Sequence, residues 1–562
     1  MTSQNIMIWL STYLTNRAHL RVLLVFTFFL AVFCWVYFSV NTLSSGDDHF
    51  FHFRFAEQIR ENGLFNSFSD FKSIYLSKMA QGNEYYVYYN FIFYLLILPF
   101  TYIQPLALGI KLYAAIMVAL SFTILYWSLD RFKVQRPFVW TIAVLSLTST
   151  SAIWRLFLSR PYAFAPALLL LFLVFLKEKK YWGVFFLGAI YFFWHTATFY
   201  FPFGIAFIYY IFEAISGKPA DRKSLFAAVG GTVASIIFCY LIAPGVYLYM
   251  KEIIFGVYVE TILGKKVNLP EGGELYSIDF FNFLQAGMLV LVFFVTSAAV
   301  DIYRYAVRRW YALSEIDPMT KNQTVRLSLL FISLGLLLGT VLISARFGDY
   351  FTFFAATYLV LAGDAIFQTL SSPNKIILRG LRIGMAITIM YLVVCNMLFL
   401  QSMLSRGAST TEFSQVGEWL NKNAKPGEVV FNPEWSWFPQ LYYVSPQLNY
   451  LTGLEPRFSY TYNPSLYWLW SNLSLHGFVC DQERCPELEA AQRLALKTEK
   501  GSEVWYKSQG QQAVKVITEK LGSTYIVTSR SFGRLNALLE GSGNFKILQG
   551  TATSTYFIFG VK

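Results

Sequence analysis

The chain has 562 residues, of which 56% are hydrophobic, 19% aromatic and only 14% charged. Soluble domains carry roughly 25% charged residues, so this composition excludes an ordinary soluble globular protein and predicts a membrane protein. The formal net charge of +12 fits basic cytoplasmic loops that set membrane orientation, and nothing in the chain resembles a nucleic-acid-binding module.

Long apolar segments dominate the chain up to residue 401. A segment of about 18 apolar residues is long enough to cross a membrane as a helix, and the sequence contains eleven such candidates. A further apolar segment, at 90–100, has about 11 residues and is predicted to lie at the membrane interface or to re-enter. The eleven predicted spans cover 21–43, 105–128, 137–154, 162–176, 182–197, 199–215, 224–243, 282–303, 326–344, 351–370 and 381–401.

Basic residues fall in every second loop between the predicted spans. With the N-terminus in the cytoplasm, each internal loop carries lysines or arginines, Lys177–Lys180 among them, as the positive-inside bias requires. With this orientation, two long loops, at 44–104 and 243–281, lie outside the membrane. Because the number of spans is odd, the C-terminal region lies outside as well. We therefore predict a mainly α-helical multi-pass protein of the cytoplasmic membrane, with a transmembrane domain over 1–405 and an extracytoplasmic domain over 406–562.

The region after residue 406 has the pattern of a small α/β domain. Cys480 and Cys485 lie in it with four residues between them. A local disulfide is one interpretation of this pair; a zinc site is the other, and it would need further ligands. The predicted helices cover 413–423, 487–496 and 511–521, and the predicted strands cover 429–431, 524–527 and 556–559.

The strongest concentration of polar groups follows the first predicted span, in Gly46-Asp47-Asp48-His49-Phe50-Phe51-His52-Phe53-Arg54. Charged groups beside a membrane are unfavourable unless they are paired or used, so this cluster is a functional candidate. Asp47 or Asp48 is suited to bind a divalent cation or to act as a general base, with His49 and His52 assisting. The alternative is that Asp47 caps a helix and the other polar groups are surface residues.

The same segment predicts a helix from Asp47 to about Asn62, with Gly63 as its stop. Apolar residues recur on one face of this helix, and we expect that face to lie on the membrane surface. The apolar residues in question are Phe51, Phe55 and Ile59.

Three arginines and a histidine lie at the external ends of predicted spans. Arg155, Arg160 and Arg346 are exceptions to the positive-inside bias, and arginine is well suited to binding phosphate through two hydrogen bonds. They predict a site for an anionic, lipid-linked phosphate. The alternative for Arg346 is an ion pair with Asp349 or contact with lipid headgroups, and for His195 it is a packing role.

Aromatic residues also gather in the predicted external regions. The segment Glu84–Asn90 contains four tyrosines, including Tyr89. Such residues form either platforms on which sugars stack or the usual aromatic belt at a membrane interface. Elsewhere, Asn472-Leu473-Ser474 fits the N-glycosylation pattern.

The pattern as a whole resembles the GT-C superfamily of integral-membrane glycosyltransferases, most of all the catalytic subunit of oligosaccharyltransferase and its bacterial and archaeal relatives. The motifs that carry the resemblance are Gly46–His49, which leads into Glu61-Asn62-Gly63, then Ser159-Arg160-Pro161 and Arg346-Phe347. The resemblance implies an enzyme that moves a sugar or oligosaccharide from a polyprenyl-phosphate or polyprenyl-pyrophosphate donor to an extracytoplasmic protein, lipid or glycan. The implied partners are the donor lipid and the membrane, not nucleic acid.

The resemblance also implies an acidic catalytic residue, here Asp47 or Asp48, and places Arg346 at the donor phosphate or at the acceptor. The acidic metal ligands that the family carries after its Ser-Arg segment are missing, as is its Trp-Trp-Asp motif. An enzyme dependent on Mg²⁺ or Mn²⁺ and a metal-independent enzyme with an aspartate base therefore both stay open. In the first case Asp48, His49 and His52 are the expected ligands. The expected supporting residues are His52, Glu84, Tyr89 and His195.

Two other classes of function also stay open. A transporter or flippase for a lipid-linked substrate predicts ionisable residues inside membrane spans, and Asp364 is the clearest acidic residue in such a position. A non-catalytic subunit of a surface-glycan assembly would account for the missing acidic ligands.

Overall fold

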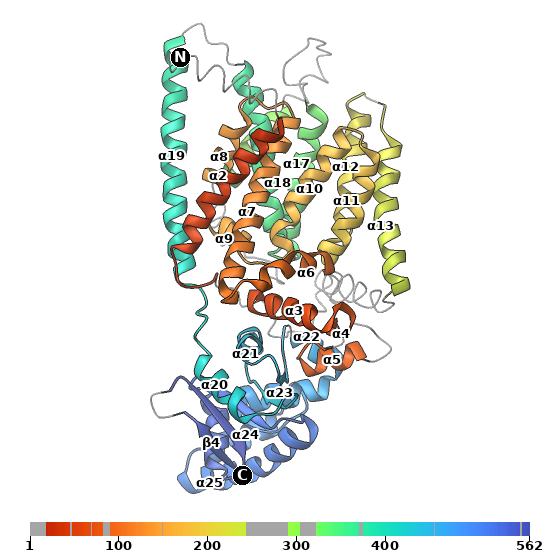
Figure 1. Ribbon diagram of the computed structural model, residues 1–562. Helices are drawn as coiled ribbons and strands as arrows, with labels where there is room; N and C mark the ends of the chain where they lie inside the picture. Colours follow the sequence, from red (N-terminus) through yellow and green to blue (C-terminus); the bar gives the residue numbers. More distant parts are fainter. Residues whose placement is uncertain are drawn as a thin grey trace.

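The structure is a computed structural model. It describes residues 18–44, 48–68, 70–81, 90–148, 150–217, 219–242, 290–303, 322–369, 375–454, 456–550 and 554–562. Figure 1 shows a bundle of long helices joined at one end to a smaller domain of helices and strands, which the C-terminal part of the chain forms. The predicted external loop 243–281 lies outside the described residues.

The bundle is apolar and helical. In the described part of the chain, six helices are long and apolar enough to cross a membrane, and five further apolar helices are shorter. These helices indicate a membrane protein. The bundle contains α2 (Ala18–Phe38), α7 (Leu106–Arg131), α8 (Pro137–Leu147), α9 (Thr150–Leu156), α10 (Pro161–Lys177), α11 (Tyr181–Trp194), α12 (Phe201–Ile215), α13 (Arg222–Ile242), the helix at 290–303, α17 (Gln323–Leu342), α18 (Phe347–Thr369) and α19 (Lys375–Ser405).

The predicted count of eleven spans is not confirmed by helix length. Helices α10 and α11 have 17 and 14 residues, against about 20 for a typical crossing. The predicted span 137–154 is divided into α8 and α9, and a side chain of α19 explains the division. The Asn396 amide nitrogen donates to the carbonyl oxygens of Leu145, Ser146 and Thr148 at 3.0–3.2 Å, at the end of α8. This amide satisfies carbonyls that a continuous helix would bond internally.

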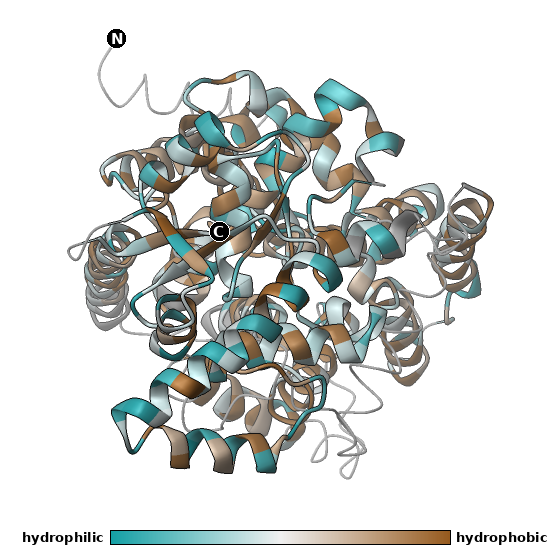
Figure 2. Cartoon of the chain, turned by 90° about the horizontal axis from the view of Figure 1, so that it is seen from below, coloured by the Kyte–Doolittle hydropathy of each residue, from teal (hydrophilic) through white to brown (hydrophobic). Residues whose placement is uncertain are grey.

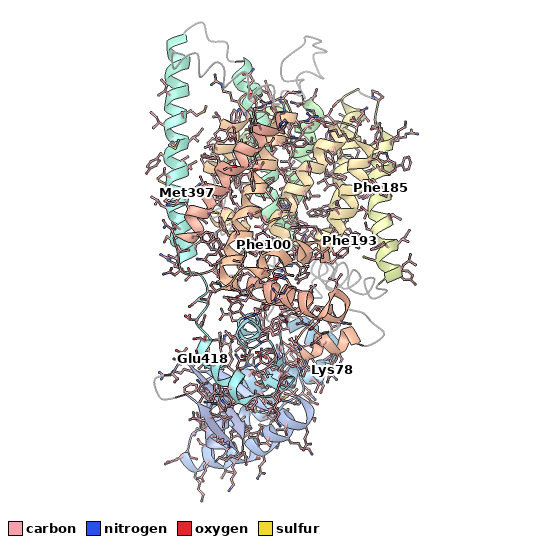
Figure 3. All side chains as sticks on the ribbon, viewed as in Figure 1. Lys78, Phe100, Phe185, Phe193, Met397 and Glu418 are labelled. Atoms are coloured by element: carbon pink, nitrogen blue, oxygen red, sulfur yellow. A yellow bond between two sulfur atoms is a disulfide. The ribbon has the colours of Figure 1, made fainter. Side chains whose placement is uncertain are left out.

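The outer surface of the bundle carries exposed apolar side chains. Helix α19 lies along one edge (Figure 1), and its residues Ile387, Tyr391 and Phe399 are more than half exposed. Figure 2 shows largely hydrophobic peripheral helices behind a C-terminal domain of mixed polarity. Figure 3 shows the same contrast in its labelled residues, with Met397 on the bundle and Glu418 on the C-terminal domain. Exposed apolar helices of this kind are typical of contact with lipid.

Short helices form a layer between the bundle and the C-terminal domain (Figure 1). They are α3 (Asp48–Asn62), α4 (Leu64–Phe68), α5 (Ile74–Gln81), α6 (Phe91–Ile97) and the 3₁₀ segment η1 (Leu98–Tyr102), to which η2 (Thr196–Thr198) is added between α11 and α12. Helix α3 matches its predicted bounds, and Gly63 follows it with a positive φ of 81°.

The prediction that the apolar face of α3 lies on the membrane surface is wrong. Phe51 and Phe55 are completely buried. The Phe51 ring packs against Phe438 and Tyr442 of α21 (Phe438–Val444) in the C-terminal domain, at centroid distances of 5.7 and 6.0 Å. The Phe55 ring stacks on Phe71 at 5.2 Å. Protein therefore covers the face that the sequence pattern assigned to lipid.

The C-terminal domain contains a five-stranded sheet with strand order β2-β1-β3-β5-β4. Strand β1 is parallel to β2 and β3, whereas β5 is antiparallel to β3 and β4. The strands are β1 (Val429–Phe431), β2 (Asn449–Tyr450), β3 (Tyr525–Ser529), β4 (Phe545–Gln549) and β5 (Tyr556–Val561). The helical segments are α20 (Ser414–Asn423), η6 (Trp435–Trp437), α22 (Pro456–Tyr462), α23 (Pro464–His476), α24 (Pro486–Ala495), α25 (Glu499–Lys515), η7 (Val516–Lys520) and α26 (Gly533–Gly541).

The three strands predicted from sequence correspond to β1, β3 and β5, so the mixed α/β character is confirmed. Strands β2 and β4 were not predicted. Strand β2 has only two residues, Asn449 and Tyr450, and a run of that length carries no periodic signal. The helix predicted at 511–521 corresponds to the last part of α25 together with η7.

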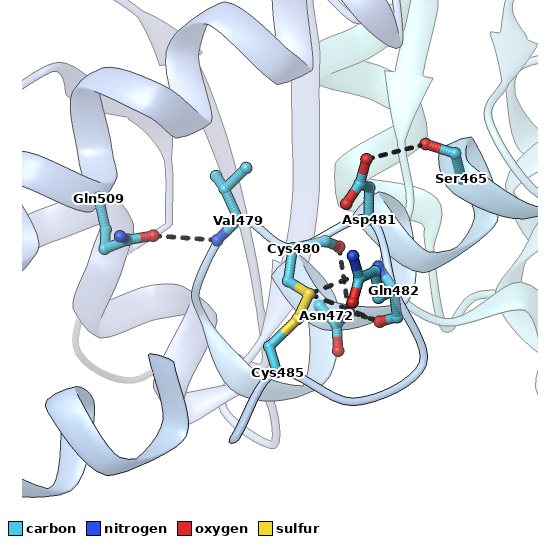
Figure 4. Close-up of a disulfide and its surroundings, with 8 residues drawn as sticks. All are labelled: Ser465, Asn472, Val479, Cys480, Asp481, Gln482, Cys485 and Gln509. Atoms are coloured by element: carbon cyan, nitrogen blue, oxygen red, sulfur yellow. Dashed lines mark hydrogen bonds between the residues drawn. A yellow bond between two sulfur atoms is a disulfide. The ribbon is translucent and has the colours of Figure 1, made fainter. Parts of the chain in front are cut away.

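Cys480 and Cys485 form a disulfide (Figure 4). The loop that this bond closes is fixed further by Asn472, whose side-chain nitrogen donates to the carbonyl oxygens of Cys480 and Gln482 at 3.0 and 2.9 Å. Because Asn472 is buried and its side-chain amide is hydrogen-bonded, this amide is not accessible for N-glycosylation in the folded domain.

Candidate functional site

The predicted site residues gather at the end of the bundle that faces the C-terminal domain. Helix α3 begins there at Asp48, α10 begins after Arg160, and α18 begins after Arg346. The chain also turns there between α11 and α12, at His195. Proline in the first turn of α10, at position 161, suits a helix start because that position needs no backbone N–H donor.

An ion pair joins the starts of α3 and α10. The Arg160 Nε atom lies 2.8 Å from the Asp48 Oδ2 atom, and the two side chains are 15% and 34% exposed. The Arg160 guanidinium also lies over the ring of Tyr162, 5.7 Å from its centroid. The pair therefore brings together a predicted catalytic carboxylate and a predicted phosphate ligand that are far apart in the sequence.

A second ion pair lies beside the first. The Arg155 Nε atom lies 2.6 Å from the Asp349 Oδ1 atom in the first turn of α18. Arg155 also lies over the Tyr162 ring, at 5.3 Å, so that this ring contacts both arginines. The sequence had suggested Arg346 as a partner for Asp349; the structure pairs this carboxylate with Arg155.

His195 is held by hydroxyl groups. Its Nδ1 atom lies 2.8 Å from the Tyr350 hydroxyl and 2.8 Å from the Thr198 hydroxyl. Arg346, half-buried just before α18, is close enough for its charge to act on this imidazole. His195 and Arg346 thus lie together, and the hydroxyl contacts of His195 fit both the supporting role and the packing role that the sequence left open.

The two histidines of α3 differ in their partners although both are buried. The His52 Nδ1 atom lies 2.9 Å from the Tyr94 hydroxyl, whereas both ring nitrogens of His49 lack a hydrogen-bond partner in the part of the chain that the structure describes. Burial, reinforced by the charge of Arg160, lowers the pKa of His49 to about 3. Burial is also the main reason why the pKa of His52 lies well below its usual value. Both imidazoles are therefore neutral near pH 7.

The ligand set expected for a metal does not assemble in the described part of the chain. No group of three or more His, Cys, Asp or Glu side chains is placed to hold an ion there. Asp48 is paired with Arg160, and His52 faces Tyr94. The remaining predicted site residues, Asp47, Glu84 and Tyr89, lie outside the described residues.

The electrostatics of this end of the bundle favour an anion. Three helices of at least 15 residues begin there, α3, α10 and α18, and a helix N-terminus carries a partial positive charge and free backbone N–H groups. Arg155, Arg160 and Arg346 add three full positive charges, against the carboxylates of Asp48 and Asp349. These five side chains together carry one net positive charge, which favours an anionic ligand over a cation.

Several residues of this cluster escaped the sequence analysis. Tyr162, Tyr350, Thr198 and Tyr94 each contact a predicted site residue. The sequence could have indicated Tyr162 and Tyr350 as site residues, because each lies within four residues of an arginine predicted to belong to the site. The sequence does not indicate Tyr94, since it lies in an apolar segment and meets His52 only through the tertiary fold.

Comparisons with known proteins do not identify the chain. No family model matches it, and no curated protein matches it either. A functional assignment therefore depends on the chemistry of the residues gathered at this end of the bundle.

Proposed function

We propose that the protein is a membrane glycosyltransferase of GT-C type, which moves a sugar or oligosaccharide from a polyprenyl-phosphate or polyprenyl-pyrophosphate donor to an acceptor outside the cytoplasmic membrane. The observation that carries the proposal is the Asp48–Arg160 ion pair at the starts of α3 and α10. It sets a carboxylate beside a cluster of arginines and helix N-termini. This combination supplies both groups that the reaction needs, a base and a phosphate ligand.

The proposal includes eleven spans with the N-terminus in the cytoplasm. Six helices have the length and composition of spans, α2, α7, α12, α13, α17 and α19. Five further crossings would be the broken pair α8–α9, the helices α10, α11 and α18, and the segment 290–303. This arrangement would put the site and the C-terminal domain on the external side, where the polyprenyl-linked donor is used.

The proposed reaction is a displacement at the anomeric carbon of the donor sugar. The donor phosphate binds to Arg160 and Arg346 and competes with Asp48 for the Arg160 guanidinium. The released carboxylate accepts the proton of the acceptor hydroxyl or amide while the acceptor atom bonds to the anomeric carbon. The bond between that carbon and the phosphate oxygen breaks, and the phosphate leaves with the electron pair, stabilised by the arginines. Asp47 is the second candidate for the base.

Turnover of a labelled polyprenyl-phosphate donor by the purified protein tests the proposal. We expect Asp48→Asn to lower turnover by about 10²–10⁴-fold, the usual contribution of a general base. Asp47→Asn is measured in parallel. Glu57→Gln is the matched control, because Glu57 lies on the same helix and pairs with Arg54 and Arg60. Full turnover in both aspartate variants would contradict the proposed base.

One observation favours a second candidate, a transporter or flippase. Asp301 and Arg326 form a buried pair at 3.0 Å within the bundle, and the Tyr358 hydroxyl donates to Asp301 at 2.8 Å. Buried ionisable groups among membrane helices commonly mark transport pathways. Asp364, the acidic residue suggested by the sequence, instead accepts a hydrogen bond from the Gln135 backbone at 3.1 Å. Donor movement across liposomes that Asp301→Asn abolishes, without any transfer reaction, would favour this candidate.

A further inference from the structure

His49 lies in the first turn of α3, next to the Asp48–Arg160 pair. Its side chain is almost completely buried, with 1% exposure. Among the described residues neither of its ring nitrogens has a hydrogen-bond partner, and its ring lies against that of the neighbouring Phe50, with centroids 4.4 Å apart. Buried polar groups are nearly always hydrogen-bonded, so an imidazole with two unsatisfied nitrogens requires an explanation.

The next histidine on the same helix provides an internal comparison. His52 is equally buried, and its ring reaches the Tyr94 hydroxyl at 2.9 Å. Helix α3 can therefore satisfy a buried imidazole, and it does so three residues further from the ion pair. The unsatisfied ring is the one at the N-terminus of the helix, where Arg160 is close enough to act on it electrostatically.

The surroundings of His49 indicate the chemistry of its missing partner. A neutral imidazole carries one N–H donor and one acceptor nitrogen. The helix N-terminus and Arg160 both attract negative charge, and the Asp48 carboxylate is already paired with Arg160. An anionic ligand can replace Asp48 in that pair, whereas the guanidinium repels a cation. An oxyanion can accept from the imidazole N–H and from the guanidinium at once. A phosphate group meets this description, because it offers several acceptor oxygens and a negative charge.

We infer that His49 is a binding residue for the phosphate of the ligand, donating a hydrogen bond from its neutral ring to a phosphoryl oxygen that Arg160 also contacts. The inference rests on the proposed function, since it deepens the account of how the donor is held. It adds a neutral contact to the charged ones. Such a contact is geometrically selective, because an imidazole N–H reaches one oxygen in one direction whereas charge acts over a distance.

Binding of farnesyl phosphate to the full-length protein in detergent tests this inference. Farnesol and inorganic phosphate are the comparison ligands, so that a lipid-linked phosphate is distinguished from free phosphate and from the hydrocarbon chain. His49→Phe keeps an aromatic ring at this position but removes the hydrogen-bond donor. We expect this variant to bind farnesyl phosphate about 10- to 100-fold more weakly, which corresponds to the loss of one hydrogen bond to a charged group. Farnesol binding should not change. His49→Gln retains an N–H donor and should recover part of the affinity.

The melting temperature without ligand provides a second measurement. An unsatisfied buried group destabilises the fold, so His49→Phe should match or exceed the wild type. His476→Phe, in the C-terminal domain, controls for the loss of a histidine elsewhere. Equal farnesyl phosphate affinity in the wild type and in His49→Phe would overturn the inference, and so would a site that binds inorganic phosphate as tightly as farnesyl phosphate. If turnover still requires Asp48 in that case, the proposed function stands although the role of His49 does not.

Discussion

The pairing of Arg155 with Asp349 makes a strong quantitative prediction. The two atoms lie 2.6 Å apart, and the side chains are 24% and 12% exposed. Removing one partner of a fully buried pair costs about 3–5 kcal/mol, because the other charge stays buried without compensation. Partial exposure of the two side chains reduces this cost. We therefore expect Arg155→Met and Asp349→Asn each to lower the free energy of unfolding by about 2–3 kcal/mol.

The double variant distinguishes a real pair from two independent residues. If the charges compensate each other, Arg155→Met with Asp349→Asn should cost little more than either change alone, which gives a coupling energy of about 2 kcal/mol. The free energies are measured by titration with SDS in mixed micelles. The exposed pair Arg493–Glu489, at 3.8 Å with side chains 82% and 40% exposed, is the matched control and should couple by less than about 0.5 kcal/mol.

Additive costs at Arg155 and Asp349 would refute the reasoning. Changes at independent sites add within about 0.5 kcal/mol, so a coupling energy below that value would mean that the ion pair does not form. Arg155 would then regain its predicted role as a free ligand for the donor phosphate. A clear coupling, by contrast, makes Arg155 a residue that holds the start of α18 and leaves Arg160 and Arg346 as the stronger candidates for binding the proposed donor phosphate.

Three further predictions follow, two about stability and one about the disulfide. Burial lowers the pKa of His49 from 6.5 to about 3, so between these pH values the unfolded state binds a proton that the folded state does not bind. The free energy of unfolding should therefore be largest above about pH 6.5 and fall by about 1.4 kcal/mol per pH unit toward pH 4. In His49→Phe the free energy of unfolding should fall less steeply with pH. Maleimide should label three cysteines in the unfolded protein and all five only after reduction, because Cys480 and Cys485 are bonded; labelling of five without reductant would exclude the disulfide. Gly477→Ala should lower the melting temperature, because φ is +67° and the new methyl group would lie 2.5 Å from a carbonyl oxygen; Gly204→Ala, in open space within α12, should not.

The local features of the site were predictable from the sequence, and the contacts between them were not. Charge at the end of an apolar segment is visible in the sequence, and it identified Asp48, Arg160 and Arg155 as candidates. Their partners depend on how distant segments pack. Asp349 pairs with Arg155, a contact that the sequence did not suggest because the two residues are almost 200 positions apart.

The apolar face of helix α3 is a second case in which the sequence predicts a local feature but not its tertiary contacts. The recurrence of Phe51 and Phe55 correctly predicts that one face is covered. Periodicity contains no information about what covers it, and lipid and protein produce the same pattern. In the structure the α21 helix of the C-terminal domain covers Phe51, although it is encoded almost 400 residues later, and Phe71 covers Phe55.

This position of α3 links the candidate site to the C-terminal domain. Beyond the site end of the helix, the Arg54 Nε atom donates to the Tyr443 carbonyl oxygen at 2.8 Å, and the Tyr442 hydroxyl donates to the Gln58 side chain at 2.5 Å. Asp48 at the other end is held by Arg160 of the bundle. Helix α3 is thus held by the bundle at its first residue and by the C-terminal domain at Arg54 and Gln58. The orientation of the predicted catalytic carboxylate therefore depends on the docking of the C-terminal domain as well as on the bundle.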